Sequence, residues 1–272
     1  PACRSAIFWE FSFLNEPVIY IKYYTLAHPE HSLHLGPLAN SHAGFECIIL
    51  AGGLGTRLRS AVPDLPKCMA PVSGKPFLQY LVDYLLKQGA GHFIFSLGYM
   101  HEVIESFLKQ NYPALHYSLA VEDEPLGTGG AIRLACTKAT HKNVVILNGD
   151  TMFAVDIQKL LAFHDQNDAA CTLTLKPMYD FDRYGVVEIN KDDYVQAFKE
   201  KKSYSSGLIN GGVYALHVSR FLKLPFPAKF SFEKDYLEKY CAFQKMMGLA
   251  QDAYFIDIGV PEDYERAGRE LG

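Results

Sequence analysis

Short apolar runs alternate with longer amphipathic segments along most of the chain, from about residue 46 onward. The short runs have the length of buried strands, whereas segments such as 76–89 repeat their apolar residues at helical spacing. Strands that alternate with helices indicate a mostly parallel sheet covered on both faces. We therefore expect an α/β, Rossmann-like fold. The expected strands are 47–50, 93–97, 115–121, 144–147 and 171–175, and the expected helices are 76–89, 101–110, 129–137 and 157–167.

The pattern changes after Pro177, where two stretches alternate apolar and polar residues as hairpin strands do. These stretches, 185–190 and 194–199, are joined by a Lys-Asp-Asp turn. We expect a small β-rich subregion here, beside the main sheet.

One apolar run ends in a glycine-rich loop that carries two cations. The strand 47–50 leads into residues 51–58 (AGGLGTRL), and Lys67 follows shortly after. Closely spaced glycines let the backbone approach a ligand and turn its N–H groups toward phosphate oxygens. Arg57 adds a planar fork of donors and Lys67 a point charge, both of which suit a polyphosphate. The loop therefore predicts a nucleoside triphosphate site.

Two better-known phosphate loops do not fit this segment. A Walker loop requires Lys-Ser or Lys-Thr after its last glycine, and no such pair follows Gly52 or Gly53 at that offset. A dinucleotide fingerprint requires a third glycine where Leu58 stands. Neither a Walker nor a dinucleotide loop is expected.

The loop and five further motifs resemble the signature of the sugar-1-phosphate nucleotidyltransferases. The resemblance runs from about residue 46 to the C-terminus and implies the nucleotide-diphospho-sugar transferase type of fold, with the β-rich subregion binding sugar. Cys68 departs from the pattern, because the family usually carries a second proline after the lysine. The further motifs are 122–130 (EDEPLGTGG), 147–150 (LNGD), 184–188 (YGVVE), 198–201 (FKEK) and 255–259 (FIDIG).

The resemblance implies attack by a sugar-1-phosphate oxygen on the α-phosphorus of a nucleoside triphosphate, which releases pyrophosphate. A phosphomonoester is largely dianionic at neutral pH, because its second pKa is about 6, so the nucleophile needs no general base. It needs charge neutralisation and in-line alignment instead. Arg57, Lys67 and Asp150 are the expected catalytic residues. The alternative for Arg57 and Lys67 is that they are solvated surface cations.

Two carboxylates are expected to hold Mg²⁺. Asp150 ends a buried strand, and Asp257 follows another apolar stretch, so both should lie at strand ends. Mg²⁺ prefers oxygen ligands and takes one or two carboxylates together with substrate phosphates. Alternatively, each aspartate caps a helix or begins a turn.

The resemblance also implies two sets of substrate contacts. Lys201 would neutralise the sugar phosphate and Glu200 would accept hydrogen bonds from hydroxyls, although the run 199–202 taken alone is a solvated charge cluster. The expected nucleotide-binding set is Leu50, Ala51, Gly52, Gly53, Gly55, Thr56, Arg57, Glu122 and Gly127. The expected sugar-phosphate-binding set is Gly185, Glu188, Glu200, Lys201, Asn210 and Gly211.

The sequence also favours one nucleobase and one sugar. The resemblance implies that the stretch with Glu122 and Gly127 meets the nucleobase. A carboxylate there can accept hydrogen bonds from N1–H and N2–H₂ of guanine, whereas uracil or thymine offers one donor. The Gly-Thr-Gly-Gly form of 127–130, together with 209–214, is most similar to the branch of the family that transfers a guanylyl group from GTP to D-glycero-α-D-manno-heptose 1-phosphate. GDP-heptose of this kind serves surface polysaccharide or glycoprotein synthesis.

Two alternatives stay open. One is an enzyme for mannose 1-phosphate or another pair of nucleoside triphosphate and sugar 1-phosphate. The other is a catalytically silent module that binds a nucleotide sugar and regulates a partner, although the presence of Arg57, Lys67, Asp150 and Asp257 disfavours it.

Composition excludes some partners. The 272 residues carry a formal net charge of −4 without a long basic run, so no nucleic-acid partner is expected. No uncharged apolar stretch reaches about 18 residues, so no membrane span is expected. The six cysteines are scattered without a C-x-x-C pair, which favours reduced thiols and a cytoplasmic enzyme. Whether the chain forms a homo-oligomer is left open.

Residues 1–45 lie outside the family resemblance. Glu10 and Glu16 interrupt any signal-peptide core. Pro29 and Gly36 argue against a regular helix that would present the histidines at 28, 31 and 34 on one face, so no metal site is expected there. We therefore expect an N-terminal extension at 1–45 and a nucleotidyltransferase catalytic domain at 46–272.

Overall fold

The computed structural model describes residues 10–12, 17–19, 44–53, 58 and 62–271. The chain divides into two compact units, Pro1–Ser41 and His42–Gly272. In the first unit, strands β1 (Glu10–Ser12) and β2 (Pro17–Ile19) form an antiparallel pair. All candidate site residues belong to the second unit.

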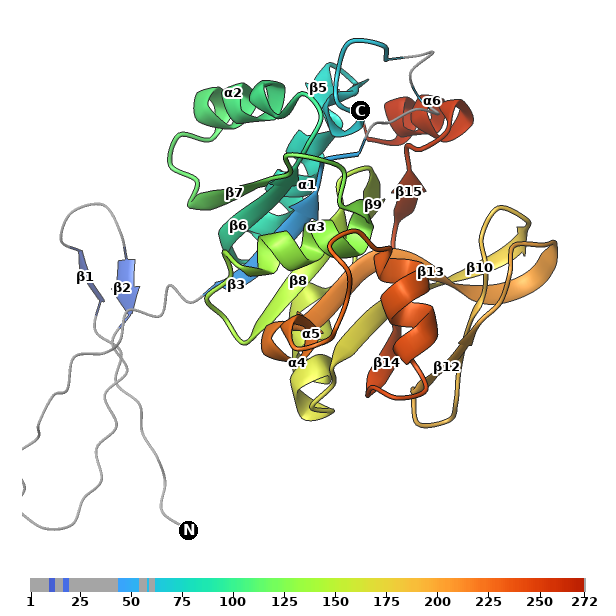
Figure 1. The fold of residues 1–272 in the computed structure, drawn as a ribbon. Helices are drawn as coiled ribbons and strands as arrows, with labels where there is room; N and C mark the ends of the chain where they lie inside the picture. Colours follow the sequence, from blue (N-terminus) through green and yellow to red (C-terminus); the bar gives the residue numbers. More distant parts are fainter. Residues whose placement is uncertain (1–9, 13–16, 20–43, 54–57, 59–61, 272) are drawn as a thin grey trace, which may run out of the picture. The chain divides into compact units, whose positions relative to one another are not determined.

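A seven-stranded sheet forms the centre of the second unit (Figure 1). Its strands are β3 (Phe45–Leu50), β6 (Ala90–Leu97), β7 (Tyr117–Val121), β8 (Asn143–Asn148), β10 (Cys171–Phe181), β13 (Tyr204–His217) and β14 (Met246–Ala250). Their order across the sheet is β14-β10-β13-β8-β3-β6-β7. Among these described strands only β13 opposes its neighbours, β8 and β10, so the expectation of a mostly parallel sheet is confirmed.

Helices cover both faces of this sheet, as the alternation of strands with helices along the sequence predicts. Along β3, Cys47 and Ile49 pack in one cluster and Ile48 packs in another, because successive side chains of a strand point to opposite faces. Helices α1, α2 and α4 join the first cluster, whereas α3, α5 and a π-helix, η2, join the second. The helices are α1 (Phe77–Lys87), α2 (His101–Asn111), α3 (Gly127–Cys136), α4 (Ile157–Gln166), α5 (Val218–Leu222), η2 (Phe232–Glu238) and α6 (Pro261–Glu270), with the 3-10 turn η1 at Lys67–Met69.

Three two-stranded ladders complete the second unit. The expected hairpin is present as β11 (Val187–Ile189) and β12 (Val195–Phe198), which pair antiparallel. Strands β4 (Pro71–Val72) and β5 (Lys75–Pro76) form a second pair, and β9 (Thr151–Phe153) and β15 (Phe255–Asp257) form a third. The β10 strand is longer than expected and continues from residue 175 to residue 181, because it pairs with the long β13.

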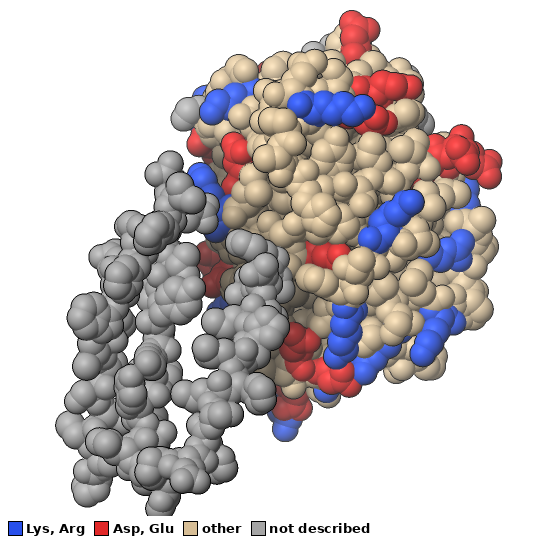
Figure 2. Space-filling model, turned by 90° about the vertical axis from the view of Figure 1, so that its left-hand side faces the viewer, with Lys and Arg blue, Asp and Glu red and all other residues tan. Residues whose placement is uncertain are grey.

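The surface shows charges of both signs. On the face seen in Figure 2, lysine and arginine side chains are interspersed with acidic ones over a mainly uncharged surface. None of the helices in the described ranges has both the length and the apolar character needed to cross a membrane.

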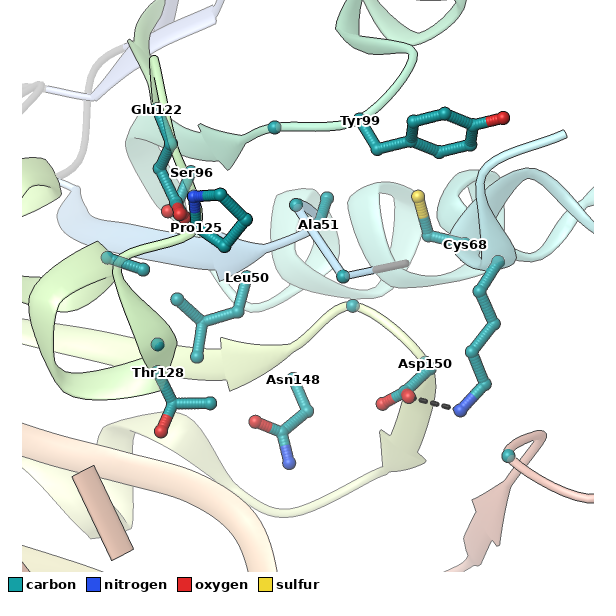
Figure 3. Close-up of a pocket in the computed structure, with 18 of the residues that line it drawn as sticks. Leu50, Ala51, Cys68, Ser96, Tyr99, Glu122, Pro125, Thr128, Asn148 and Asp150 are labelled. Carbon is teal, nitrogen blue, oxygen red and sulfur yellow. Dashed lines mark hydrogen bonds and ion pairs between the residues drawn. The ribbon is translucent and has the colours of Figure 1, made fainter. Parts of the chain in front are cut away.

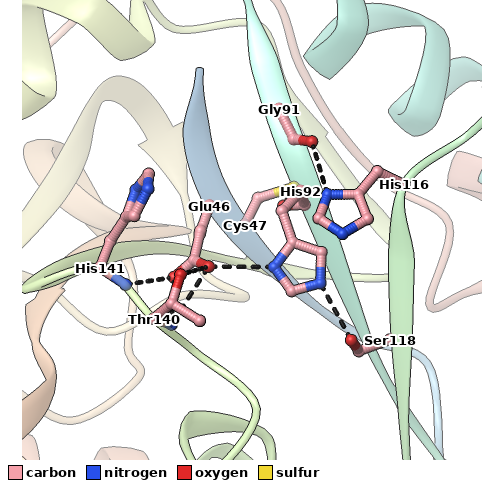
Figure 4. Close-up of polar contacts among 8 residues, drawn as sticks. All are labelled: Glu46, Cys47, Gly91, His92, His116, Ser118, Thr140 and His141. Atoms are coloured by element: carbon pink, nitrogen blue, oxygen red, sulfur yellow. Dashed lines mark hydrogen bonds and ion pairs between the residues drawn. The ribbon is translucent and has the colours of Figure 1, made fainter. Parts of the chain in front are cut away.

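A buried carboxylate ties the first residues of β3 to a distant loop (Figure 4). Glu46 is only 2% exposed, and its carboxylate accepts hydrogen bonds from N and Oγ1 of Thr140, at 2.8 and 2.7 Å, and from N of His141, at 2.8 Å. His92 Nδ1 lies 3.0 Å from the same carboxylate. Burial alone would raise the pKa of Glu46, but these hydrogen bonds outweigh burial and lower that pKa to about 2.

This network predicts an acid-sensitive contribution to stability. The folded-state pKa of Glu46 lies below the ordinary value of 4.5, so its stabilisation is present above pH 4.5 and is lost as the pH falls from 4.5 toward 2. The shift corresponds to roughly 3 kcal/mol. We expect Glu46→Gln to lower the free energy of unfolding by up to this amount at pH 7 and by much less at pH 3, as measured by urea denaturation.

The exposed Glu265 supplies the matched control, because Glu265→Gln removes the same charge from the surface. Equal unfolding free energies for the wild type and Glu46→Gln at pH 7 would show that the network does not stabilise the fold.

Candidate active site

A cavity of about 690 Å³ opens at the carboxyl ends of β3, β6 and β8 (Figure 3). In an open parallel sheet this is where ligands are expected to bind. Residues from both the predicted nucleotide set and the predicted catalytic set line the cavity, namely Leu50, Ala51, Gly52, Gly53, Glu122, Gly127, Lys67 and Asp150. Three further predicted residues, Gly55, Thr56 and Arg57, lie outside the described residues.

The inner end of the cavity is formed by backbone that packs too closely for side chains. Gly149 N donates a hydrogen bond to Leu50 O at 2.9 Å, and a Cβ on Gly149 would lie 2.5 Å from that oxygen. A Cβ on Gly52 would lie 3.0 Å from Gly98 N and 3.3 Å from Glu122 Oε1. The glycines let these strand ends pack closely against one another, and the phosphate-binding role expected for Gly52 stays a prediction.

A lysine and two aspartates meet at one end of the cavity. Lys67, the first residue of η1, forms an ion pair with Asp150, and its Nζ lies 3.9 Å from Asp257 Oδ1. Figure 3 marks the Lys67–Asp150 pair. The side chain of Lys67 is 12% exposed, so the alternative of a solvated surface cation does not hold for this residue.

The pairing of β9 with β15 brings the two aspartates together, although 107 positions separate them in the sequence. Asp257 lies opposite Thr151 in this ladder, and Ile258 N donates to Asp150 O at 3.0 Å. Gly259 N donates to Asp257 Oδ1 at 2.7 Å, and a Cβ on Gly259 would lie 2.8 Å from Lys67 Nζ. This glycine leaves room for the charged side chains.

The two aspartates are chemically suited to Mg²⁺. Asp150 lies in the turn just before β9, not at the end of a strand as the sequence predicted, and Asp257 is the last residue of β15, which pairs with β9. One or two carboxylates are what this ion usually takes from a protein, with phosphates and waters as its other ligands. Within the described ranges no group of three His, Cys, Asp or Glu side chains is placed to hold a metal by itself. A site of this kind would need the phosphates of a substrate to complete it.

Glu122 lies at the other end of the cavity, where β7 ends. Its backbone N donates to Leu97 O at 2.9 Å, and its Oε2 accepts from Leu126 N at 2.9 Å. Burial raises the pKa of Glu122, and the bond from Leu126 only partly opposes that effect. The carboxylate is therefore fixed in position and incompletely hydrated.

Several cavity residues were not predicted from the sequence. Ser96 is 1% exposed, and its Oγ has no hydrogen-bond partner among the described residues. One signal for it existed, since it is a polar residue inside the apolar run 93–97. Thr128 belongs to the Gly-Thr-Gly-Gly motif, but Glu233 is more than 100 positions away, and nothing in the local sequence indicated its presence. Other unpredicted lining residues include Cys68, Tyr99 and Asn148.

The predicted sugar-phosphate set does not line this cavity. Glu188 lies on β11 and forms an ion pair with Lys199 at 3.3 Å, and Glu200 and Lys201 are exposed. Their assignment to the sugar phosphate stays a prediction.

The remaining members of that set make local structural contacts. Asn210 Nδ2 donates to the Tyr214 hydroxyl at 2.8 Å, and Asn210 Oδ1 accepts from Gly212 N at 3.1 Å. A Cβ on Gly211 would lie 2.2 Å from the Phe153 ring, and one on Gly185 would lie 2.4 Å from Lys199 O. Close packing is enough to explain both glycines, whether or not a sugar also approaches them.

The model of one family, described as nucleotidyl transferase, matches residues 46–272. The chain belongs to the nucleotidyl transferase family. The matched region begins at residue 46, where the family resemblance of the sequence also begins.

Individual relatives of this nucleotidyltransferase are similar over nearly their whole length. The D-glycero-alpha-D-manno-heptose 1-phosphate guanylyltransferase of Aneurinibacillus thermoaerophilus is 52% identical over 83% of this chain and 98% of its own. The enzyme of the same name from Campylobacter jejuni is 45% identical over 80% of this chain and 96% of its own. The crystal structure of HddC from Yersinia pseudotuberculosis complexed with GMP-PN superimposes with a TM-score of 0.76 at 38% identity, over 84% of this chain and all of HddC.

The paired aspartates generate a prediction for this nucleotidyltransferase. Asp150→Asn and Asp257→Asn should each lower kcat by at least about 10²-fold, the scale of losing one charge-stabilising group. Pyrophosphate release measures this, and a chelator should abolish the wild-type rate until Mg²⁺ is restored.

Asp252→Asn is the matched control, because Asp252 is a 76%-exposed carboxylate paired with Lys176 away from the cavity. Wild-type turnover in both cavity variants would refute the assignment of Asp150 and Asp257 as metal ligands.

Proposed function

We propose that this nucleotidyltransferase transfers the guanylyl group of GTP to D-glycero-α-D-manno-heptose 1-phosphate and releases pyrophosphate and GDP-heptose. The relatives at 52% and 45% identity carry that activity in their names, and the chain covers 98% and 96% of their lengths. The observation in the structure that best supports the proposal is the half-buried Glu122 carboxylate at the cavity end remote from Lys67 (Figure 3).

This carboxylate suits guanine better than the other bases. Guanine presents N1–H and N2–H₂ on one edge, and a carboxylate can accept from both donors. Uracil and thymine would turn a carbonyl oxygen toward the same group, and adenine has no N1–H. Because Glu122 is half-buried, an unmatched base would leave its carboxylate with Leu126 N as its protein partner and no donor from the ligand, which is costly.

The other end of the cavity suits the triphosphate. With the base at Glu122, the phosphates extend toward Lys67, whose Nζ is held by Asp150 beside Asp257. Lys67 would neutralise phosphate charge and hold the departing pyrophosphate. Mg²⁺ bound by Asp150 and Asp257 would supply further neutralisation of the phosphate oxygens.

The reaction needs no proton acceptor from the protein. An oxygen of the sugar phosphate, already anionic, forms a bond to the α-phosphorus while the bond from that phosphorus to the β-bridging oxygen breaks. Pyrophosphate leaves with the electron pair of that bond. The task of the chain is to hold both anions in line and to exclude competing water.

The sugar phosphate is proposed to bind beside Asp257, toward the β-rich subregion. Tyr184, the first residue of the YGVVE motif, packs edge-on against Phe255 with ring centroids 5.9 Å apart. Phe255 and Asp257 lie on the same short strand, β15. The motif that carries Gly185 and Glu188 therefore begins next to the strand that carries a proposed metal ligand.

A substrate grid tests the base and the sugar separately. With heptose 1-phosphate, kcat/KM for GTP should exceed that for UTP, dTTP, CTP and ATP, by up to about 10³-fold where Glu122 meets a carbonyl oxygen. With GTP as the nucleotide, kcat/KM for heptose 1-phosphate should exceed kcat/KM for mannose 1-phosphate. Faster turnover with another triphosphate would contradict the choice of guanine, whereas faster turnover with mannose 1-phosphate would change the sugar alone.

Glu122 also predicts a pH dependence for GTP binding. The carboxylate must be ionised to accept both guanine donors, and its raised pKa means that ionisation is lost at a higher pH than for an ordinary glutamate. We expect KM for GTP to rise as the pH is lowered toward that pKa and the Glu122→Gln variant to show a flatter profile. Identical pH profiles of KM would contradict a role for the Glu122 charge.

A further inference from the structure

A second carboxylate lines the nucleoside end of the cavity. Glu233 lies in the π-helix η2, and its Oε2 accepts hydrogen bonds from Thr128 Oγ1 at 2.7 Å and from Ser231 Oγ at 2.9 Å. Its other oxygen, Oε1, makes no hydrogen bond to the residues that the structure describes. A cavity carboxylate is thus oriented through one oxygen while the second remains available to a ligand.

The Gly-Thr-Gly-Gly motif places this carboxylate at the cavity. Gly127 has a φ of +72°, and a Cβ there would lie 2.6 Å from Phe230 O. A Cβ on Gly129 would lie 2.2 Å from the Phe230 ring, and one on Gly130 would lie 2.5 Å from Ala228 O. These glycines let α3 pack directly on the segment just before η2, so the motif serves this contact as well as any contact with a nucleotide.

Thr128 fixes the orientation of Glu233. Its hydroxyl donates to Glu233 Oε2 and accepts from Phe232 N at 2.9 Å. Because it both donates and accepts, the hydroxyl is held in one orientation. Ser231 Oγ donates to the same oxygen at 2.9 Å and accepts from Lys234 N at 3.2 Å. Thr128 is in this sense a positioning residue for the carboxylate.

The position of Glu233 limits what it can bind. In Figure 3 Thr128 lies across the cavity from Glu122, with Leu50 between them, and Asp150 lies at the far end. Lys67 is the ion-pair partner of Asp150. A carboxylate repels phosphate, so its ligand must be a hydrogen-bond donor. For a nucleotide with its base at Glu122 and its phosphates at Lys67, the donors that lie between base and phosphate are the vicinal hydroxyls of ribose.

We propose that Glu233 binds the 2′,3′-diol of the ribose and makes this nucleotidyltransferase selective for ribonucleotides over 2′-deoxyribonucleotides. The inference rests on the proposed function for the placement of base and phosphates. A vicinal diol is also present in the heptose, so the test varies the nucleotide and the sugar independently.

The test compares kcat/KM for GTP and 2′-dGTP at saturating heptose 1-phosphate. A hydrogen bond to a charged group is strong, so the wild type should prefer GTP by roughly 10- to 100-fold. Glu233→Ala should reduce this ratio to within about threefold, because it lowers the value for GTP more than the value for 2′-dGTP, which keeps only the 3′-hydroxyl. Glu233→Gln is the more conservative substitution, and it should also reduce the ratio if the alanine variant fails to fold.

Two controls separate this role from a purely structural one. Glu238→Ala removes an exposed carboxylate from the same π-helix outside the cavity and should keep the wild-type ratio. Thr128→Val should lower the ratio because it removes the hydroxyl that orients Glu233, and Thr128→Ser should restore it.

An unchanged GTP to 2′-dGTP ratio in folded Glu233→Ala would overturn the inference. So would a variant in which KM for heptose 1-phosphate rises while the nucleotide ratio is preserved, since Glu233 would then bind the sugar substrate. If another triphosphate replaces GTP as the substrate, the proposed function fails. The same ratio, measured with that triphosphate and its 2′-deoxy form, still decides the role of Glu233.

Discussion

The cavity depends on the close approach of peptide groups at the carboxyl ends of three neighbouring strands. Gly149 N bonds to Leu50 O at 2.9 Å, and Ala51 N bonds to Ser96 O at 2.8 Å. A Cβ at residue 149 would lie 2.5 Å from the Leu50 oxygen, closer than real contacts allow. Any side chain there would push β8 away from β3. Because Asp150 follows directly, that shift would also displace the carboxylate that holds Lys67.

Charge is arranged so that the two ends of the cavity accept different parts of one ligand. The Lys67 end has a cation between two carboxylates, which suits phosphates together with a divalent ion. The other end has Glu122 and Glu233, which accept hydrogen bonds and repel phosphate. This arrangement supports the proposed orientation, in which the base lies at Glu122. In that orientation the α-phosphorus would lie toward Asp257 on β15, the strand that meets the YGVVE motif.

The fold could be predicted largely from the sequence because its signals are local. Apolar runs and helical spacing predicted five of the seven central strands, the hairpin and four of the helices, whereas β13, β14 and α6 were not predicted. The motifs indicated Lys67 and Asp150 separately, and only the fold shows that they form an ion pair. Glu233 was not predictable, because it reaches the cavity through glycine packing between α3 and the segment before η2. Gly185 and Gly211 were predicted to contact the sugar phosphate, and the structure shows that close packing also requires a glycine at each position. That packing is visible only in three dimensions.

The central claim is that one cavity holds GTP with its base at Glu122 and its phosphates at Lys67. A crystal structure of this chain with a non-hydrolysable GTP analogue measures that placement directly. We expect guanine N1–H and N2–H₂ within hydrogen-bond distance of the Glu122 carboxylate and β- or γ-phosphate oxygens within hydrogen-bond distance of Lys67 Nζ. Guanine bound away from Glu122, or phosphates at the Glu122 end, would contradict it.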